Sequence, residues 1–478
     1  MGTDLINISS HSNLQPEDSS ILPLVDNCFL RQPEGNCNAG ESGAKTFFIE
    51  TFGCQMNDHD SEKVAGVLMA RGYRPVEKSS EADLVLYNTC SIREKAAQKV
   101  FSHLGALKKA RPDRPPIIGV LGCVAQQEGD RIFERAPQVS LVCGSASYAK
   151  LPDLLARLES GQRRVTGLSL DIDECFETEL TRRDNPFRAY LTIIEGCDKA
   201  CSYCVVPMTR GPERSRRSDG LLADCQRLAD EGYTEIQLLG QTVNSYSDPS
   251  PARLSFAQLL VRVAEVQGIR RVRFTTSHPS DFTPEIVAAI DSTPALCNQI
   301  HLPVQSGSDT VLARMRRTYT REEYLSKIDC IHHAMRAISI STDIIVGFCG
   351  ETEEDFEQTL SLLEVVEYDL VYSFKYSPRP ITAAGGWADD VPDEEKGRRL
   401  AAVQDRQREI QLRRNNTLIG SEFEVLVEGF QPRLQQVVGR TTRNQTVNFP
   451  GSADSVGQYV NVRITAAGPH SLVGTRMG

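Results

Sequence analysis

The first long patterned segment of the chain alternates between two kinds of apolar stretch. Between Lys45 and Glu159 the continuous apolar runs are TFFIE, ADLVLY and PIIGVL, and between them apolar residues recur three and four positions apart, as at Val64, Val67 and Leu68. Runs of the first kind predict buried strands and the spacing of the second kind predicts helices. Because strands that alternate with helices form parallel sheets, residues 45–160 are predicted to fold as an α/β domain.

Six further strand-like runs follow, separated by helical stretches such as GLLADCQRLADEG and SFAQLLVRVAEVQG. The runs are AYLTIIEG, TEIQLL, RRVRFTT, NQIHLPV, ISTDIIVGF and YDLVYSFKYS. Six strand–helix units are too few for the closed eight-fold barrel, so residues 183–414 are predicted to form an open, partial (β/α)6 barrel.

The two ends of the chain have other patterns. Residues 1–44 are polar and acidic without a helical or strand period, which predicts a flexible tail with incidental cysteines at Cys28 and Cys37. From residue 416 to 478 the short alternating runs EFEVLVEGF, QVVGRTTRNQTVNF and QYVNVRITAAG predict a small antiparallel β-barrel.

Composition narrows the class of protein. The 478 residues are 40% hydrophobic, contain no apolar run of membrane-spanning length and do not begin with a secretory signal. Fourteen cysteines in such a chain indicate reduced thiols and metal ligation, hence a cytoplasmic protein without membrane partners, which we expect to be a monomer. Because the net charge is −10, binding of nucleic acid has to come from local basic patches.

Three cysteines in the run CDKACSYC, namely Cys197, Cys201 and Cys204, are the strongest chemical signal. Cysteine thiolates bind iron–sulfur clusters, and three ligands leave one iron of a four-iron cluster open to an outside molecule. Half of a zinc site and a redox dithiol are the alternatives. A zinc site lacks a second ligand pair nearby, since VVPMTRGPERSRR has no Cys or His, and a dithiol leaves Cys197 unexplained.

A second set of three cysteines, Cys54, Cys90 and Cys123, follows the predicted strands of the first domain at spacings of 36 and 33 residues. Parallel strands end at the same edge of a sheet, where open α/β sheets bind ligands, so these thiols are predicted to hold a second cluster. A helix beginning with SIREKAAQ would favour the Cys90 thiolate. The alternative is that the three are small buried hydrophobic residues, as we expect for Cys143.

These motifs resemble a known family. The spacing of CDKACSYC, with Tyr203 before its last cysteine, resembles radical S-adenosylmethionine (SAM) enzymes, and TFGCQMN, NTCSIRE and a C-terminal barrel similar to the TRAM RNA-binding domain resemble the methylthiotransferase family. The runs CSYCVVPMTRGPERSR, LLGQTVNSY, HLPVQSGSD and YSPRP resemble its transfer-RNA branch, which adds a methylthio group to C2 of N6-dimethylallyladenosine beside the anticodon.

The resemblance implies two [4Fe-4S] clusters and SAM as cofactors. Cys197, Cys201 and Cys204 would hold the catalytic cluster, which binds SAM and cleaves it to a 5′-deoxyadenosyl radical, because an aromatic C–H bond is too strong for acid–base chemistry. Cys54, Cys90 and Cys123 would hold the auxiliary cluster that carries the inserted sulfur. An electron donor of flavodoxin or ferredoxin type is also implied.

The cavity for SAM and substrate is expected to include residues that follow the core strands. The candidates are Tyr203, Gln241, Ser277, Gln305 and Gly347, whereas His278 and His301 are expected to be structural histidines. The chain departs from the family's usual residues at Thr242, Cys349, Ile381 and Ala383.

Two arginine-rich runs are candidates for RNA contact. The first, just after the cluster loop, contains Arg210, Arg214, Arg216 and Arg217, and the second, Arg398 to Arg414, contains six arginines. Arginine binds phosphate and stacks on bases, although such runs are also typical of solvated faces.

Several functions remain open at this point. Threonylcarbamoyl-adenosine in tRNA and a ribosomal-protein aspartate are alternative substrates within the family. An iron–sulfur carrier or RNA-binding scaffold without catalysis is the alternative from another class.

Overall fold

The computed structural model describes residues 44–90, 115–170 and 180–477. The tail with Cys28 and Cys37 and the helix expected after Cys90 lie outside these described residues. Within the described ranges, no helix combines the length and apolarity needed to cross a bilayer.

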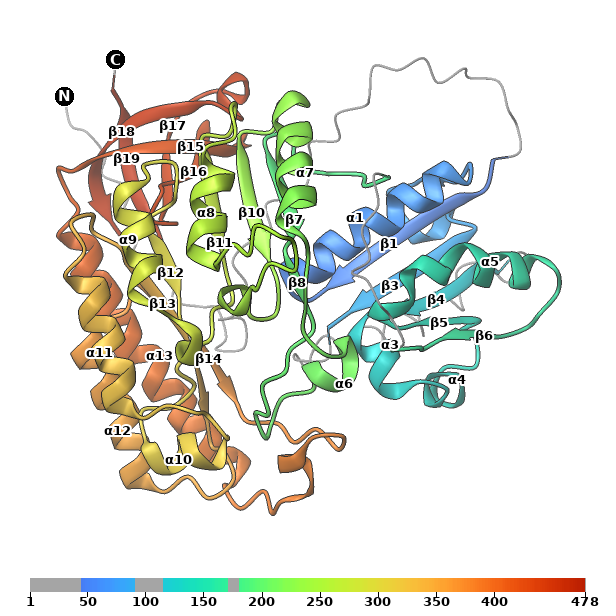
Figure 1. Ribbon diagram of the computed structural model, residues 1–478, viewed down its shortest axis with the longest axis horizontal. Coiled ribbons are helices and arrows are strands. Elements are labelled where there is room, and N and C mark those ends of the chain that lie inside the picture. The colour runs from blue at the N-terminus through green and yellow to red at the C-terminus, as the bar shows by residue number, and fades with distance from the viewer. Residues whose placement is uncertain (1–43, 91–114, 171–179, 478) are drawn as a thin grey trace. The chain divides into compact units, whose positions relative to one another are not determined.

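The first domain is a parallel α/β sheet, as the apolar runs predict (Figure 1). Its strand order is β2–β1–β3–β4–β5–β6, and every described pairing is parallel. The strands are β1 (Thr46–Phe52), β2 (Arg74–Pro75), β3 (Leu84–Thr89), β4 (Ile117–Leu121), β5 (Leu141–Cys143) and β6 (Val165–Gly167). Strands β2, β5 and β6 have only 2, 3 and 3 residues, too few to give a patterned run, and β6 extends the sheet beyond residue 160.

Helices cover both faces of this sheet, which explains why its strands are apolar without alternation. Leu68 and Leu154 pack on one face, and Ile132 and Phe133 pack on the other. The described helices are α1 (Gln55–Ala70), α3 (Cys123–Glu128), α4 (Arg131–Arg135) and α5 (Leu151–Glu159), with the short 3-10 helices η1 (Ser79–Glu81) and η2 (Ser145–Lys150).

The second domain has the six parallel strands that the sequence predicts, arranged as an open barrel. The strands are β7 (Arg188–Thr192), β10 (Glu235–Leu239), β11 (Arg271–Phe274), β12 (Gln299–His301), β13 (Ser339–Val346) and β14 (Leu370–Lys375). They form two three-stranded ladders, β11–β10–β7 and β12–β13–β14. A parallel bridge between Val272 and Leu296 joins the two ladders.

Helices follow the strands and enclose one large apolar core. Helices α8, α11 and α12 each begin at a capping box, with Ser255, Thr320 and Thr352 as N-caps. The helices are α7 (Ser218–Asp230), α8 (Phe256–Ala264), α9 (Pro284–Ser292), α10 (Asp309–Arg314), α11 (Arg321–His332), α12 (Glu353–Val366) and α13 (Asp393–Asn416). Smaller elements are β8 (Ile194–Glu195), α6 (Val206–Arg210), β9 (Arg214–Ser215), η3 (Val243–Ser245), η4 (Pro279–Asp281) and η5 (Ala383–Gly386).

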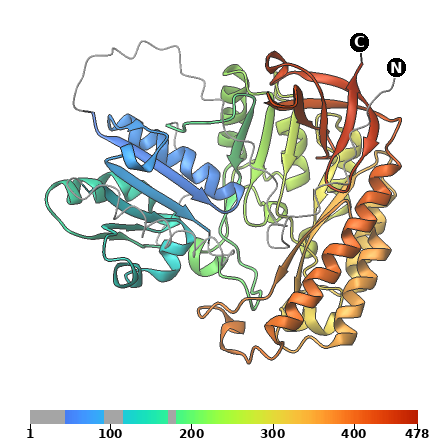
Figure 2. The same cartoon turned by 180° about the vertical axis from the view of Figure 1, so that it is seen from behind.

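The C-terminal strands close into the predicted barrel, in the order β15–β16–β17–β19–β18. They are β15 (Glu422–Gln431), β16 (Gln436–Arg440), β17 (Thr446–Pro450), β18 (Tyr459–Ala467) and β19 (Leu472–Arg476), with η6 (Ala453–Ser455) before β18. The pairing of β17 with β19 is parallel, a departure from the antiparallel prediction. The barrel packs at the end of the core where β11 begins, since Arg271 donates to the Arg440 carbonyl oxygen at 2.9 Å (Figure 2). The carboxyl ends of the core strands remain for the site.

Candidate functional site

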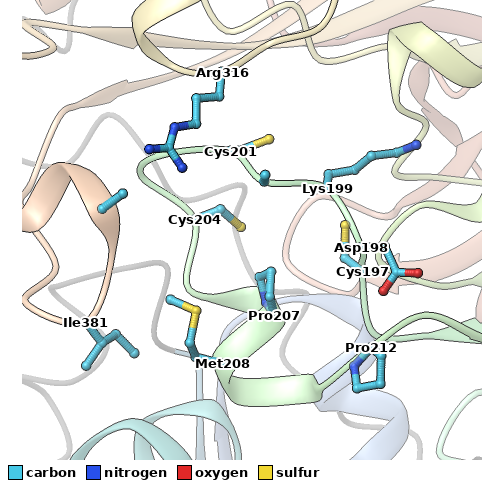
Figure 3. A pocket seen from close by; sticks show the side chains of 12 residues that line it. Cys197, Asp198, Lys199, Cys201, Cys204, Pro207, Met208, Pro212, Arg316 and Ile381 are labelled. Carbon is cyan, nitrogen blue, oxygen red and sulfur yellow. The ribbon is translucent and has the colours of Figure 1, made fainter.

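The loop between β8 and α6 brings its cysteines to one cavity. Cys197, Cys201 and Cys204 all line this cavity, which has a volume of about 490 Å³ (Figure 3). The lining also includes two cations, Lys199 and Arg316, and an apolar group that consists of Pro207, Met208, Ile381 and Ala383. Pockets of this size bind small molecules and cofactors.

Hydrogen bonds fix the shape of this loop. The Gly196 amide donates to Gln241 Oε1 at 2.6 Å, and the Cys197 amide donates to the Gly211 carbonyl at 3.2 Å. In the middle of the loop, Ser202 Oγ donates to the Arg314 carbonyl at 2.8 Å. The cysteine loop is therefore held by contacts to the residues that follow β10 and α6 and to the end of α10.

The charge state of these thiols depends on what binds them. Burial raises the pKa of the Cys204 thiol to about 12, and it also raises the pKa of Cys197. A thiolate in such surroundings is stable only beside a cation, and the irons of a cluster supply that charge. Arg317 supplies another, because its Nη1 donates to Cys201 Sγ at 3.4 Å. The donor set fits a [4Fe-4S] cluster.

The other cysteine set lies where the sheet predicts it. Cys54 is the N-cap of α1, Cys90 directly follows β3, and Cys123 opens α3 after β4. Glycines precede two of these cysteines, Gly53 before Cys54 and Gly122 before Cys123. A Cβ added at Gly53 would lie 2.5 Å from Cys90 Cβ, and a Cβ added at Gly122 would lie 2.4 Å from Asn88 Oδ1. The strand ends thus approach one another more closely than other residues would allow.

The surroundings of Cys54 favour its thiolate. A hydrogen bond with Cys90 and the charge of Arg210 lower the pKa of the Cys54 thiol to about 6, against the effect of desolvation. Arg210 is held by Asp60 at 2.6 Å and by Asn57 Oδ1 at 3.4 Å. Such surroundings favour thiolates, the form that binds metal.

Neither cysteine set resembles a site for a single ion. Across residues 44–90, 115–170 and 180–477, no three His, Cys, Asp or Glu side chains converge on one metal position. An iron–sulfur cluster makes a different demand, because each thiolate binds a different iron of the cluster and the ligands stand further apart.

The residues expected around SAM have varied surroundings. Gln241 holds the cluster loop through Gly196, and Tyr203 packs its ring edge against Phe348, with ring centroids 6.3 Å apart. Ser277 is buried, and its Oγ has no hydrogen-bond partner among the residues described. An orphaned hydroxyl of this kind is suited to a polar ligand.

Two further candidates, Gln305 and Gly347, lie where the backbone has a positive φ. Gln305 has a positive φ of 76° and its amide donates to the Asp343 carbonyl at 2.9 Å. At Gly347 a Cβ would lie 2.3 Å from Lys396 Cγ, so the close neighbour of this glycine is α13.

The two histidines both have protein partners. His278 Nδ1 accepts a hydrogen bond from the Ser280 amide at 3.3 Å, and burial lowers the pKa of this histidine to about 3. His301 Nδ1 lies 3.0 Å from Ser341 Oγ. Cys143 is fully buried in the core of the first domain, as predicted, and burial raises the pKa of its thiol to about 12.

The first arginine run turns mostly inward. Arg210 is buried against Asp60, whereas Arg214 and Arg216 have side chains only 13% and 14% exposed and pair with acidic residues. Arg217 is the open one of this set, with its side chain 57% exposed. Burial of Arg210 turns its charge toward the second cysteine set and away from an external polyanion.

The second arginine run, on α13, is neutralised largely by the acidic residues of α12 and its flanks. The pairs are Arg398–Glu353, Arg399–Glu351, Arg406–Glu364, Arg413–Glu367 and Arg414–Asp369. This run therefore serves the packing of α13.

Sequence reasoning missed the cations nearest the first cysteine set. Lys199, Arg316 and Arg317 lie at the cavity or at a thiol, and the run RMRR at 314–317 was a signal for the last two. The sequence does not tell which arginine of that run turns inward.

Comparison with family models divides the chain into three matches. Residues 46–144 match the uncharacterized protein family UPF0004, residues 191–363 match the radical SAM superfamily, and residues 416–475 match the TRAM domain. The radical SAM match implies a [4Fe-4S] cluster and SAM.

Relatives match almost the whole chain. The tRNA-2-methylthio-N(6)-dimethylallyladenosine synthase of Solibacter usitatus is 61% identical over 439 residues, 91% of this chain and 98% of that protein. The protein of the same name from Koribacter versatilis is 55% identical over 442 residues, 91% of this chain and 99% of that protein.

Among solved structures, the radical SAM methyltransferase TsrM of Kitasatospora setae is similar with a TM-score of 0.53. It is 14% identical and covers 72% of this chain and 74% of that chain, so the likeness concerns the fold alone.

Proposed function

The chain belongs to the family of tRNA-2-methylthio-N6-dimethylallyladenosine synthases, and from that premise we propose that it inserts a methylthio group at C2 of N6-dimethylallyladenosine beside the anticodon of tRNA. The observation that carries the proposal is the pair of cysteine sets, one around a cavity of about 490 Å³ and one at the carboxyl edge of the other sheet. Sulfur insertion at an unactivated C–H bond needs a radical source and a sulfur source, and two clusters supply both.

Cys197, Cys201 and Cys204 are the proposed ligands of the catalytic cluster. When bound, this cluster offers an open iron to SAM and the electron that cleaves it. The chain's own contribution is to hold three thiolates in a loop fixed by Gln241 and by α10, beside a cavity large enough for a cofactor.

Polar residues at the ends of the core strands are the proposed SAM and substrate contacts. Support comes from Ser277, whose buried Oγ lacks a partner among the described residues, and from Gln305 in the neighbouring turn. The Lys199 and Arg316 cations at the cavity suit the carboxylate of SAM or a phosphate of the RNA.

Cys54, Cys90 and Cys123 are the proposed ligands of an auxiliary cluster. The lowered pKa of Cys54 favours its thiolate at neutral pH, which assists ligation. The distance between the two clusters decides whether sulfur and radical meet at one nucleotide.

RNA recognition is assigned to the C-terminal barrel of residues 416–478, together with the exposed Arg217. The match to the TRAM domain supports this assignment. We further expect the chain to act as a monomer that receives electrons one at a time from a flavodoxin- or ferredoxin-like donor.

The decisive test is nucleoside analysis of tRNA from cells with and without this protein. The 2-methylthio derivative of N6-dimethylallyladenosine should disappear with the gene and return with the wild-type chain. Cys197→Ala and Cys54→Ala should fail to restore it, whereas Cys143→Ala, which removes a core thiol outside both sets, should restore it.

The rival functions give other results. Persistence of that nucleoside together with loss of methylthio-threonylcarbamoyl-adenosine, or of a modified ribosomal-protein aspartate, would reassign the substrate. Purified protein that holds iron yet releases no 5′-deoxyadenosine from SAM after reduction would favour a carrier.

A further inference from the structure

Arg317 lies directly against the first cysteine set without lining its cavity. Arg317 is only 8% exposed, and its Nη1 donates a hydrogen bond to Cys201 Sγ at 3.4 Å. The neighbouring Arg316 has a positive φ of 56°, and it is exposed and lines the cavity. The left-handed turn therefore sends two adjacent guanidinium groups in different directions.

The other hydrogen bonds of Arg317 hold the guanidinium in place. Nη2 donates to the Pro303 carbonyl at 2.9 Å and Nε donates to the Tyr319 hydroxyl at 2.8 Å. That hydroxyl donates in turn to the Val304 carbonyl at 2.8 Å. The planar fork is thus fixed on one side by the backbone that leaves β12, which leaves Nη1 aimed at the thiol.

The charge of Arg317 has no carboxylate to balance it. In the described part of the chain its acceptors are a carbonyl, a phenol oxygen and the Cys201 sulfur. A buried cation without a counter-ion is costly, so an anion is expected within reach. Burial raises the pKa of Tyr319 to about 12, so this phenol stays neutral at physiological pH. Of the three acceptors, only Cys201 can become an anion, as a thiolate bound to the cluster.

We propose that Arg317 is a positioning residue for the catalytic cluster, which donates a charged hydrogen bond to the Cys201 thiolate and so favours the reduced cluster. The inference rests on the proposed function, because it requires the cluster at Cys197, Cys201 and Cys204. One electron from the external low-potential donor reduces the cluster and adds one negative charge. A fixed cation at a ligating sulfur stabilises that extra charge, since hydrogen bonds to sulfur are among the factors that set cluster potentials.

The test is a redox titration of the reconstituted full-length protein, followed by EPR. The signal that changes when SAM is added identifies the cluster with the open iron. Arg317→Met should shift the ratio of reduced to oxidised cluster at a fixed potential at least tenfold toward the oxidised form, which is about 59 mV for a one-electron couple. Arg317→Lys retains the charge but loses the fork, and a smaller shift in the same direction is expected.

Two matched variants separate the hydrogen bond from other effects. Arg316→Met removes an adjacent exposed charge, and Tyr319→Phe removes the anchor of Nε without touching the thiol. Both should shift the ratio less than Arg317→Met. If Arg317→Met binds too little iron to titrate, the ratio of reduced to oxidised cluster is compared between Arg317→Lys and Arg316→Lys instead.

The outcomes are distinct. An unchanged midpoint potential in Arg317→Met, or an equal shift in Arg316→Met, would overturn the inference and leave the proposed function standing. Wild-type protein that holds no SAM-responsive cluster would overturn the proposed function itself.

Discussion

The two cysteine sets are assembled in opposite ways. Cys197, Cys201 and Cys204 lie in one loop, so their closeness follows from the chain itself. Cys54, Cys90 and Cys123 follow three different strands and lie at one edge of the sheet only because β1, β3 and β4 pair side by side in parallel. The first set therefore depends on a few hydrogen bonds that hold one loop, and the second depends on the register and packing of a whole domain.

The surroundings of the two sets differ as well. Each has one buried arginine, but Arg210 is balanced by Asp60, whereas Arg317 has a cysteine sulfur as the acceptor that can become an anion. The pKa of Cys54 is lowered to about 6 and that of Cys204 is raised to about 12. The surroundings of Cys54 therefore favour its thiolate, whereas burial favours the neutral thiol at Cys204.

The largest expected effect is a loss of activity, which should occur at a different reaction step for each cysteine set. Cys197→Ala should abolish reductive cleavage of SAM, because a cluster with one ligand fewer is lost or altered at its open iron. Cys54→Ala should retain SAM cleavage and lose the methylthio product, with iron content reduced in both variants. Iron analysis and 5′-deoxyadenosine assay check this, and loss of SAM cleavage in Cys54→Ala would show that the sets are not independent.

Breaking the buried ion pair between Arg210 and Asp60, beside the second cysteine set, should lower the free energy of unfolding more than removing an exposed ion pair. Asp60→Ala leaves the Arg210 charge buried without its partner, which costs about 3–5 kcal/mol of unfolding free energy. Urea denaturation measures it. Asp219→Ala removes the partner of the exposed Arg217 and should leave the midpoint unchanged. Equal behaviour of the two variants would contradict the burial of Arg210.

Adding a methyl group beside each cysteine set should lower the free energy of unfolding more at the second set, where the packing is tighter. Gly122→Ala and Gly211→Ala both introduce a Cβ at positive φ, 87° and 78°, with ψ of −158° and −168°, a backbone region that is essentially restricted to glycine, which costs about 1–3 kcal/mol. At Gly122 the Cβ would also lie 2.8 Å from the Thr89 carbonyl oxygen, whereas the nearest atom at Gly211 is at 3.8 Å. Gly122→Ala should therefore cost about 1–3 kcal/mol more in the same denaturation experiment. A smaller cost at Gly122 would mean that the strand ends yield easily.

The smallest effect is a difference in reactivity that leaves stability unchanged. In cluster-free protein, Cys54 should alkylate with a half-maximal rate near pH 6, because its thiolate predominates above its pKa. Cys204, with a pKa of about 12, should remain a thiol and react slowly at pH 7. Peptide mass spectrometry after a short iodoacetamide pulse measures both, and faster labelling of Cys204 would reverse the comparison.

The longer strands and the cysteine loop could be predicted from local patterns, and the placement of Cys54, Cys90 and Cys123 after strands followed from the strand–helix alternation. TFFIE became β1 and PIIGVL contains β4, and CDKACSYC became the cavity loop. Strands β2, β5 and β6 escaped prediction because so few residues show no period. RNA contact by Arg210 stays a prediction, and its burial against Asp60 favours a role inside the protein.

The sequence by itself determined which residues form strands and helices and where the six thiols fall relative to them, because apolar periodicity and ligand spacing act between near neighbours in the chain. Only the tertiary structure decided the electrostatic surroundings of those thiols. Asp60 and Arg210 are 150 positions apart, and Cys201 and Arg317 are 116 apart. Coulomb energy and desolvation depend on distance and burial in space, so the charge that faces each sulfur exists only in the folded chain.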